Sequence, residues 1–436
     1  MPTLQVITLG CSKNTVDTEH LLHQVRGSYE IVPEGEDRPV DVLAINTCGF
    51  IGDAKEQSIN TILAAAGRKN AGLAGRLVVF GCLSQRYPDQ LPGLIPEVDG
   101  WYGARELDSL VKALGCVPDH SEDYLRVRTD RKPYAYLKIS EGCNRRCSYC
   151  AIPFIRGAHK SVPMAKLVDE ARSLAADGVR ELIIIAQDTT YYGLDLYGRR
   201  ALAELLDRLS EVEGIERMRI HYSYPQDFPE DVLDRMANNP KVCRYMDIPL
   251  QHISDKVLDN MHRGVDGAWT RALVQRMRDK VPGLVLRTTF IVGHPGEGPA
   301  EFRELMNFVR ETGFQRMGAF AYSEEEGTFG ADHLKDSVSP RTKKSRLSRL
   351  MELQRGISLA YNQSRIGTVQ KVLVDAFSDG ILICRSEFES PEVDGEILVK
   401  YSATDFDGKQ PESLIGEFLD VRITGADEYD LTAEVL

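Results

Sequence analysis

Between residues 134 and 365 the sequence repeats one pattern six times: an apolar stretch of strand length, then a stretch with helical periodicity. The expected strands are 134–139, 181–186, 218–222, 245–248, 285–292 and 317–322. The expected helices are 163–176, 202–212, 229–237, 269–280, 299–312 and 340–365. Repeated strand–helix units build a parallel sheet, so the pattern predicts a partial (β/α) barrel with functional residues at the carboxyl ends of its strands.

A chain of 436 residues exceeds one ordinary hydrophobic core and suggests about three domains. Residues 1–120 also alternate strands with helices and predict an N-terminal α/β domain with a parallel sheet. Residues 130–338 contain the partial barrel, and residues 339–364 form a basic linker helix. Residues 365–436 hold short strands, typical of a small OB-like β-barrel. The expected fold class is therefore α/β multidomain.

The linker helix is basic and carries an apolar stripe. Residues 340–365 contain seven Lys or Arg and one Glu. The apolar side chains at near-helical spacing are Leu347, Leu350, Ile357 and Tyr361. We expect the stripe to pack on the barrel, while the basic face could contact RNA or the acidic segment that follows.

Three cysteines, Cys143, Cys147 and Cys150, lie at C-x3-C-x2-C spacing after the first expected barrel strand. Closely spaced cysteines supply thiolates to iron–sulfur clusters, and three thiolates leave one iron of a four-iron cluster open to another ligand. The alternatives are a cluster used only for electron transfer and a structural zinc site with a distant fourth ligand. Zinc sites usually pair two C-x2-C units, and this sequence has no second pair.

A second group of three cysteines follows the expected strands 4–9, 41–45 and 76–80 of the N-terminal domain. Its members are Cys11, Cys48 and Cys82. Ligands of an open α/β sheet collect beyond the carboxyl ends of its strands, so the fold would bring these thiols together. One such cysteine alone is more often a small buried side chain, but three predict a second three-thiolate site. Cys116, Cys243 and Cys384 have no comparable context, and we expect them to be structural or incidental.

Polar residues follow four of the expected barrel strands. They are Gln187 and Asp188, Ser223 and Tyr224, Gln251 and His252, and the segment 293–297. Each alone is compatible with turn chemistry or a satisfied buried group, whereas their shared position predicts a binding site. A lone histidine in a polar loop is more often an ordinary hydrogen-bonding group, so His252 and His294 stay outside the expected metal ligands.

The sequence predicts a cytoplasmic protein. No apolar run approaches the roughly 18 to 20 residues that a membrane span needs, and the first ten residues lack the features of a signal peptide. In that compartment we expect the nine cysteines to be ligands or buried thiols and not disulfides.

Five motifs together carry a resemblance to a known family. They are Gly-Cys-Ser-Lys-Asn (10–14), Ile-Asn-Thr-Cys-Gly-Phe-Ile (45–51), Gly-Cys-Leu-Ser-Gln-Arg-Tyr (81–87), Lys-Ile-Ser-Glu-Gly-Cys-Asn-Arg-Arg-Cys-Ser-Tyr-Cys-Ala-Ile-Pro (138–153) and Ile-Pro-Leu-Gln-His-Ile-Ser-Asp (248–255). The whole chain resembles the methylthiotransferase family of radical S-adenosylmethionine (SAM) enzymes, on its protein-modifying side. Departures from the family's later motifs are His294, Gly298, Glu324 and Phe329, where Phe, Thr, Pro and Pro are expected.

The resemblance implies an N-terminal methylthiotransferase domain, a radical SAM barrel and a C-terminal TRAM domain. It also implies two 4Fe-4S clusters, a SAM-binding one on the C-x3-C-x2-C loop and an auxiliary, sulfur-carrying one on the N-terminal cysteines. The expected SAM contacts, chosen by position, are Tyr149, Gln187, Asp188 and Gln251.

The implied reaction adds a methylthio group to the β-carbon of an aspartate in ribosomal protein S twelve. A 5'-deoxyadenosyl radical would remove hydrogen from this carbon, which is not acidic enough for an ordinary side-chain base. The implied partners are the ribosomal protein, met free or within the small subunit, and an electron donor such as flavodoxin or ferredoxin. The rival functions are a tRNA adenosine methylthiotransferase and a non-catalytic iron–sulfur scaffold or sulfur carrier.

The last domain is strongly acidic. Residues 365–436 contain 16 Asp or Glu and 6 Lys or Arg, a net charge of −10 within the chain's −12. Such a surface repels nucleic acid and attracts a basic protein, so we do not expect nucleic acid to be the direct substrate. We expect the docking surface to include Glu387, Glu389, Glu392 and Asp394.

Overall fold

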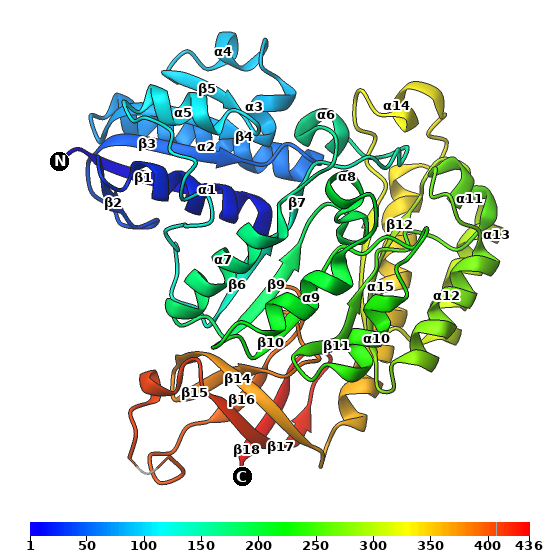
Figure 1. Ribbon diagram of the computed structural model, residues 1–436. Coiled ribbons are helices and arrows are strands. Elements are labelled where there is room, and N and C mark those ends of the chain that lie inside the picture. Colours follow the sequence, from blue (N-terminus) through cyan, green and yellow to red (C-terminus); the bar gives the residue numbers. More distant parts are fainter. Residues whose placement is uncertain (407) are drawn as a thin grey trace. The chain divides into compact units, whose positions relative to one another are not determined.

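The computed structural model describes residues 1–406 and 408–436. The chain folds into two compact units, each made of several segments (Figure 1). The first unit contains Met1–Arg131, Ser140–Arg145 and Cys150–Glu170, and the second contains Lys132–Ile139, Arg146–Tyr149 and Ala171–Leu436. Among the described residues, no helix has both the length and the apolar character that a membrane crossing requires.

The first unit is built on a parallel sheet in the order β2-β1-β3-β4-β5. The strands are β1 (Thr3–Thr8), β2 (Glu30–Val32), β3 (Val40–Thr47), β4 (Ala74–Gly81) and β5 (Gly100–Gly103). The helices are α1 (Ser12–Val25), α2 (Gly52–Asn70), α3 (Cys82–Arg86), α4 (Leu91–Leu94), α5 (Leu107–Ala113) and α6 (Ile152–Arg156). Alternate residues of β3 enter different apolar clusters, Leu43 and Ile45 in one, Val42 and Ala44 in the other. The expected parallel α/β sheet is confirmed.

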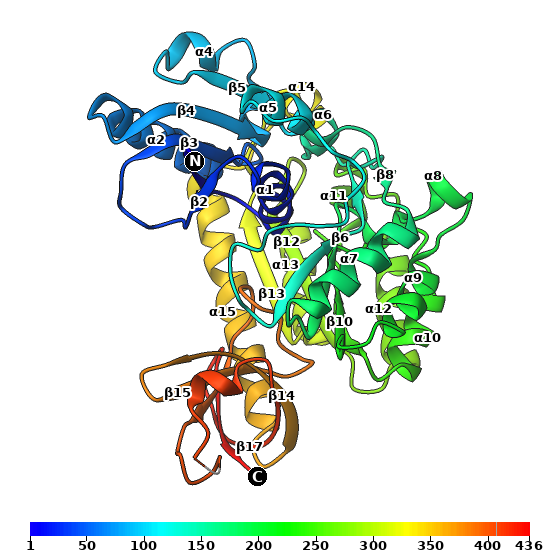
Figure 2. The same ribbon diagram turned by 60° about the vertical axis from the view of Figure 1, so that its left-hand side comes forward.

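The second unit contains six strands in the order β13-β12-β11-β10-β9-β6, each parallel to its neighbours. They are β6 (Tyr134–Lys138), β9 (Glu181–Ile185), β10 (Arg217–Ile220), β11 (Val242–Asp247), β12 (Val285–Val292) and β13 (Arg316–Ala321). The two edges of this sheet are β13 and β6 (Figure 2). The partial (β/α) barrel expected from the alternation is therefore confirmed.

Helices connect these strands, and their starts follow from local sequence. The long ones are α7 (Met164–Ala176), α9 (Leu202–Ser210), α10 (Asp231–Asn238), α12 (Gly267–Lys280), α13 (Pro299–Thr312) and α15 (Pro340–Ser364). The short ones are α8 (Leu194–Tyr197), α11 (Asp255–Asn260), α14 (Phe329–His333) and the 3-10 turn η1 (Thr189–Tyr191). Asp266 caps α12 by accepting a hydrogen bond from the Trp269 N–H at 2.7 Å. Ser339 caps α15, which starts on a proline.

The buried face of α15 is largely polar. Leu350 is buried as expected, but the other buried side chains of this face are Lys343, Arg346, Gln354, Ser358 and Asn362. Lys343 donates to the carbonyl oxygen of Tyr322 at 3.1 Å, and Arg346 pairs with Glu297 at 2.6 Å. The expected packing of the stripe on the barrel holds for the buried Leu350 and for Tyr361, which packs against Tyr245 and Val285. Leu347 and Ile357 are half-buried. Lys343 and Arg346 therefore make contacts within the second unit and do not belong to an exposed basic face.

The last segment forms a closed barrel in the order β14-β15-β16-β18-β17. Its elements are β14 (Val369–Ser378), β15 (Ile381–Arg385), β16 (Ile397–Lys400), β17 (Phe418–Ala426), β18 (Leu431–Val435) and the 3-10 turn η2 (Pro411–Leu414). Val374, Leu382, Val399 and Val421 fill its core together with the thiol of Cys384. The expected small OB-like barrel is confirmed.

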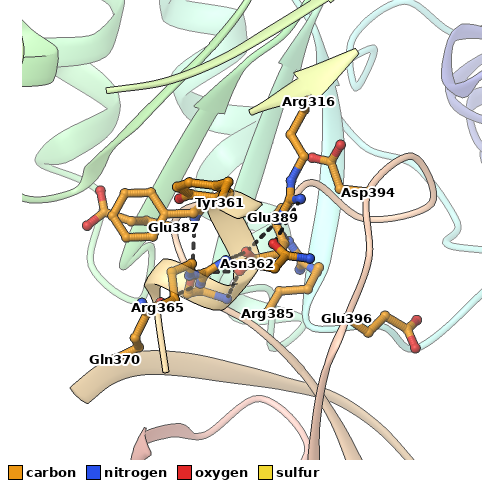
Figure 3. Close-up of polar contacts among 12 residues, drawn as sticks. Arg316, Tyr361, Asn362, Arg365, Gln370, Arg385, Glu387, Glu389, Asp394 and Glu396 are labelled. Carbon is orange, nitrogen blue, oxygen red and sulfur yellow. Dashed lines mark hydrogen bonds and ion pairs between the residues drawn. The ribbon is translucent and has the colours of Figure 1, made fainter. Parts of the chain in front are cut away.

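Buried ion pairs join this barrel to the amino-terminal ends of the strands of the partial barrel. Glu181, the first residue of β9, is fully buried and accepts from Arg219 Nε (2.9 Å) and Arg385 Nη1 (3.0 Å). Glu389 is 1% exposed and pairs with Arg316 of β13 at 3.2 Å (Figure 3). Burial alone would raise the pKa of both carboxyls, but the nearby arginines lower each to about 2.

The four acidic residues expected to form a docking surface belong to this junction. Glu389 is buried in it, and the side chain of Asp394 is 3% exposed. Glu387 accepts a hydrogen bond from Arg244 at 2.7 Å, and Asp394 accepts one from the hydroxyl of Tyr245 at 2.6 Å. Glu392 accepts one from the hydroxyl of Tyr136 at 2.7 Å. The expectation of a free surface is wrong for Glu389 and Asp394, which are buried in the junction. Glu392 is 51% exposed and stays at the surface, where it pairs with Lys132 at 3.1 Å.

Candidate functional sites

Cys11, Cys48 and Cys82 lie at the carboxyl edge of three adjacent parallel strands. The register of β1, β3 and β4 aligns Thr8, Asn46 and Phe80. Two or three residues beyond these positions come Cys11, Cys48 and Cys82. The fold therefore brings all three thiols to one edge of the sheet.

Glycines beside these cysteines allow their loops to approach one another. A Cβ on Gly10 would lie 2.8 Å from the Cβ of Cys48 and 3.2 Å from its sulfur. Gly81 has a φ of 103°, and a Cβ there would lie 2.8 Å from the carbonyl oxygen of Thr47. Any larger residue at either position would push the cysteine loops apart.

Polar residues of the sequence motifs hold the same loops in place. Asn14 is fully buried, and its Nδ2 donates to the carbonyl oxygens of Leu9 (2.7 Å) and Thr47 (3.1 Å). Thr47 in turn donates from its hydroxyl to the carbonyl oxygen of Phe80 at 2.7 Å. These bonds tie the ends of β1, β3 and β4 together, which fixes the backbone that carries the thiols.

Arg156, at the end of α6, contacts this cysteine group directly. Its side chain is buried, and Nε donates to the sulfur of Cys82 at 3.3 Å. The same guanidinium pairs with Asp17 (2.6 Å) and Glu141 (3.0 Å). A cation beside a sulfur favours the thiolate. Sequence analysis missed this residue, because its contact with Cys82 joins positions 74 residues apart.

The thiols of the group influence one another. Burial raises the pKa of Cys82 to about 11, and the other two thiols act in the same direction, against the effect of Arg156. Burial also raises the pKa of Cys48, again with a contribution from Cys11. Such mutual influence requires proximity, and a metal centre bound there would have to displace the thiol protons.

The C-x3-C-x2-C loop lies between β6 and α6. Gly142, just before its first cysteine, has a φ of 75°, and a Cβ there would lie 2.2 Å from the carbonyl oxygen of Ala158. The Cys143 N–H donates to the carbonyl oxygen of Gly157 at 3.0 Å. Glycine at 142 is therefore required for the chain to enter the loop.

Arg263 is the cation beside the second cysteine of this loop. It is 3% exposed, and Nη1 donates to Cys147 Sγ (3.4 Å) and to Tyr149 Oη (3.2 Å). Nη2 donates to the carbonyl oxygen of Pro249 at 2.6 Å, and the guanidinium lies 4.2 Å from the ring centroid of Tyr224. Within the described ranges no carboxylate pairs with Arg263, and its Nε has no hydrogen-bond acceptor. No sequence pattern marked this residue.

Gln251 lies beyond the end of β11 in an unusual backbone conformation. Its φ is 72°, although it is not a glycine. Its N–H donates to the carbonyl oxygen of Thr289 (2.8 Å), and its carbonyl oxygen accepts from the Ile291 N–H (2.8 Å). The side-chain Oε1 is buried and has no donor among residues 1–406 and 408–436. A strained residue with an unsatisfied acceptor at this edge of the barrel is typical of a ligand site.

Gln187 and Asp188 follow β9, as expected. Asp188 is 1% exposed and accepts from the Thr190 N–H at 3.0 Å and from its hydroxyl at 2.5 Å. This cap of η1 occupies one carboxylate oxygen. The four expected SAM contacts, Tyr149, Gln187, Asp188 and Gln251, stay a prediction.

His252 and His294 are both fully buried. His252 Nε2 lies 3.3 Å from the carboxylate of Glu297, and His294 Nε2 lies 3.3 Å from Ser148 Oγ. Burial lowers the pKa of His294 to about 4, so its ring is neutral at pH 7. The ring packs edge-on against Tyr149, which explains how His replaces the Phe of the family motif.

In the part of the chain that the structure describes, no three His, Cys, Asp or Glu side chains surround a point where one metal ion would bind. A four-iron cluster places its thiolates at separate corners of a cube and so needs a wider arrangement.

Three family models match successive parts of the chain. Residues 3–103 match the Uncharacterized protein family UPF0004, residues 137–309 the Radical SAM superfamily and residues 366–436 the TRAM domain. Curated proteins called ribosomal protein uS12 methylthiotransferase RimO match nearly the whole chain. The protein of Bacteroides thetaiotaomicron is 48% identical over 435 residues, which cover 99% of this chain and 98% of that protein. The protein of Flavobacterium johnsoniae is 48% identical over 433 residues, 99% and 97% of the two chains.

Solved structures share the fold at low identity. The radical SAM methyltransferase TsrM of Kitasatospora setae, with cobalamin and a [4Fe-4S] cluster bound, aligns with a TM-score of 0.55 and 17% identity over 74% of this chain and 72% of its own. The cobalamin-dependent SAM radical enzyme OxsB aligns with a TM-score of 0.52 and 13% identity over 81% and 56%. These likenesses support the architecture alone.

Proposed function

Because this chain belongs to the RimO family of ribosomal protein uS12 methylthiotransferases, we propose that it adds a methylthio group to the β-carbon of an aspartate in uS12. The proposal rests on the match of nearly the whole chain to relatives of that name. Together with the match to the Radical SAM superfamily, it identifies the chain as a radical SAM transferase. A tRNA substrate and a non-catalytic scaffold are not favoured, since the matching relatives are named as enzymes that modify a ribosomal protein.

We assign one 4Fe-4S cluster to each group of cysteines. The auxiliary cluster would be held by Cys11, Cys48 and Cys82, and the SAM-binding cluster by Cys143, Cys147 and Cys150. Each group offers three thiols and one buried guanidinium at a sulfur, a donor set suited to an anionic cluster. Bound there, the clusters and SAM would supply the electron, the radical and the sulfur that protein side chains cannot provide.

The chain's own residues bind and orient these groups. Arg263 holds Cys147 and Tyr149 through two hydrogen bonds, so this part of the loop is ordered by protein contacts alone. Gln251 offers its buried Oε1 to a hydrogen-bond donor of SAM. We retain Gln187 and Asp188 as SAM contacts by position.

The proposed function is tested by mass spectrometry of uS12 and of tRNA from cells with and without this gene. We expect one methylthio group on a single uS12 aspartate, present only when the gene is intact, and unchanged tRNA. Loss of a tRNA modification with unaltered uS12 would replace the proposal with the tRNA-modifying function.

We further propose that the enzyme works in the cytoplasm and takes electrons from a flavodoxin or ferredoxin. Its substrate is met free or in the small ribosomal subunit, and charge would guide that encounter. The exposed acidic residues of the C-terminal barrel include Asp379, Glu412, Glu417, Asp420, Asp427 and Glu434. Together with the exposed Glu392, they form the candidate attractive surface for a basic protein.

Association with uS12 is expected to slow as the salt concentration rises, because exposed charges are screened beyond roughly 8 Å at physiological ionic strength. Reversing Glu412, Glu417 and Asp420 to Lys should lower the association rate roughly tenfold at low salt, measured by surface plasmon resonance. Reversing the exposed cations Lys400, Lys409 and Arg422 to Glu is the control and should not slow it. Equal rates for both variants would exclude electrostatic guidance by this barrel.

Arg156→Lys is expected to make the auxiliary cluster harder to reduce. The substitution keeps the charge near Asp17 and Glu141 but removes the N–H that reaches Cys82. Hydrogen bonds to cluster sulfurs favour the more negative reduced state, and one bond to a charged group is worth roughly a tenfold change in the reduced-to-oxidised ratio. Redox titration followed by electron paramagnetic resonance measures this ratio for each cluster.

Arg263→Lys is the matched variant for the SAM-binding cluster, since Arg263 donates to Cys147. Each substitution should change the reduced-to-oxidised ratio of one cluster and leave that of the other cluster unchanged. The iron content of both variants should equal that of the parent protein. If either variant changed this ratio for both clusters, the result would show a general loss of structure and would contradict the assignment.

A further inference from the structure

The strand β13 leaves one edge of the six-stranded sheet without a partner strand. The Tyr322 N–H, just after β13, donates to the carbonyl oxygen of Val292 in β12 at 2.8 Å. Along a parallel strand, the backbone N–H and C=O groups of successive residues point alternately to one side of the strand and to the other. Met317, Ala319 and Ala321 therefore direct their N–H and C=O groups away from β12. In the described part of the chain these groups have no hydrogen-bond partner.

A cavity of about 270 Å³ lies at the start of this open edge. It is lined by Arg316 and Met317 of β13, by Gln354 of α15 and by Asp394 and Asp430 of the C-terminal barrel. Arg316 is 5% and Gln354 4% exposed, yet neither Arg316 Nε nor Gln354 Oε1 has a partner among the described residues. The other nitrogens of Arg316 are bound to Glu389 and to α15 (Figure 3).

An unsatisfied donor and an unsatisfied acceptor beside an open strand edge match the chemistry of a peptide backbone. A peptide C=O would accept from Arg316 Nε, and a peptide N–H would donate to Gln354 Oε1. Further along, the outward groups of β13 continue the same pattern of donors and acceptors. The six residues of β13 span about 20 Å, at roughly 3.3 Å per residue.

Charge and apolar surface along this edge indicate the kind of segment that fits. Beyond β13 the chain continues as Ser-Glu-Glu-Glu (323–326), in which Glu324 and Glu326 are exposed. Glu392, whose side chain is 51% exposed, lines the cavity at the other end together with Asp430. Between them Phe320 is 56% exposed, a large fraction for an aromatic residue on a strand. A basic segment in extended conformation complements these features.

We propose that an extended basic segment of the substrate protein adds to β13 as a further parallel or antiparallel strand, with one end in this cavity. This inference rests on the proposed function, because it takes uS12 as the partner. Main-chain hydrogen bonds would hold the segment beside the carboxyl ends of the barrel strands, and the acidic ends would select basic side chains. The open edge is thus the docking site of the polypeptide that carries the reacting aspartate.

The test measures binding of a synthetic peptide that covers the uS12 aspartate and its basic flanks to the anaerobically reconstituted full chain. Ala319→Pro removes one outward N–H, a change that edge strands tolerate, and should raise the Kd at least roughly tenfold. Gly318→Ala is the control. It keeps every N–H, and its Cβ would lie no closer than 4.0 Å to a neighbouring heavy atom, so the Kd should not change. An unchanged Kd for a folded Ala319→Pro protein would overturn the proposal.

Hydrogen exchange on the unsubstituted protein gives a second, independent result. Addition of the peptide should slow exchange of the Met317, Ala319 and Ala321 amides and leave those of β6, the opposite edge, unaffected. Protection of β6 alone, or of neither edge, would overturn the proposal. Failure of the proposed function is distinguishable, because the unsubstituted protein would then neither bind nor modify this peptide.

Discussion

Replacing Cys143, Cys147 and Cys150 together with Ala is expected to leave about half of the iron in anaerobically reconstituted protein and to abolish cleavage of SAM. The substitution removes every thiolate of the C-x3-C-x2-C loop, to which we assign the SAM-binding cluster. Iron and sulfide analysis measures the first effect, and chromatography of 5'-deoxyadenosine measures the second. Cys11, Cys48 and Cys82 should still retain their own cluster.

The reciprocal variant separates the two sites. Replacing Cys11, Cys48 and Cys82 with Ala should also leave about half of the iron, yet SAM cleavage should continue without transfer of a methylthio group. Cys116→Ala is the control, because its thiol lies beside the core of the first unit and not in either group. Full iron content in the triple variant would show that no cluster binds at the edge of the first sheet.

Glu181→Gln is expected to lower the free energy of unfolding of the second unit by about 3 to 5 kcal/mol, because it leaves buried guanidinium groups without their carboxylate. Arg219 and Arg385 bind Glu181 directly, and Arg217 lies 3.8 Å away. Burial opposes ionisation, but Arg385 and Arg219 lower the pKa of Glu181 from 4.5 to about 2. The ionised carboxylate therefore stabilises the fold above pH 4.5, and this stabilisation is lost as the pH falls towards 2.

The two tryptophans of the chain make this measurement specific. Trp101 belongs to β5 of the first unit and Trp269 to α12 of the second. In a Trp101→Phe background, urea unfolding followed by fluorescence reports the second unit alone. Glu434→Gln is the control, since its side chain is 63% exposed and lies 3.9 Å from Arg422, so no measurable loss is expected. Equal stability of both variants would contradict a structural role for the buried junction.

Local sequence patterns were sufficient to predict the sheet architecture and the placement of the cysteines. Cys11, Cys48 and Cys82 each follow a strand of the first sheet closely. Parallel strands end at a common edge, so these neighbours in space could be inferred without a structure. The contacts that the arginines make with the cysteines could not be predicted from the sequence. Arg156 reaches Cys82 across 74 positions and Arg263 reaches Cys147 across 116, and neither separation has a period that a sequence pattern reveals.

Composition also failed to distinguish exposed charges from buried ones. The acidic residues at 387, 389, 392 and 394 read as a solvated surface, yet Glu389 is almost completely buried. Lys343 and Arg346 of α15 appeared to belong to an exposed basic face. Instead, Lys343 binds Tyr322 just after β13, and Arg346 binds Glu297 in the loop between β12 and α13. A buried ion pair and two exposed charges have the same sequence signature, because only the fold decides whether the partners meet.

The bond between Glu181 and Arg385 spans 204 positions of the chain, which has a consequence for synthesis. While the protein is being translated, β9 has left the ribosome long before β15 exists. Until the C-terminal barrel emerges, Glu181 and Arg219 at the amino-terminal ends of the strands are not buried by it and stay hydrated. A product that terminates before Arg385 would keep this surface open and so be recognised by chaperones and proteases, which ties survival of the enzyme to completion of its chain.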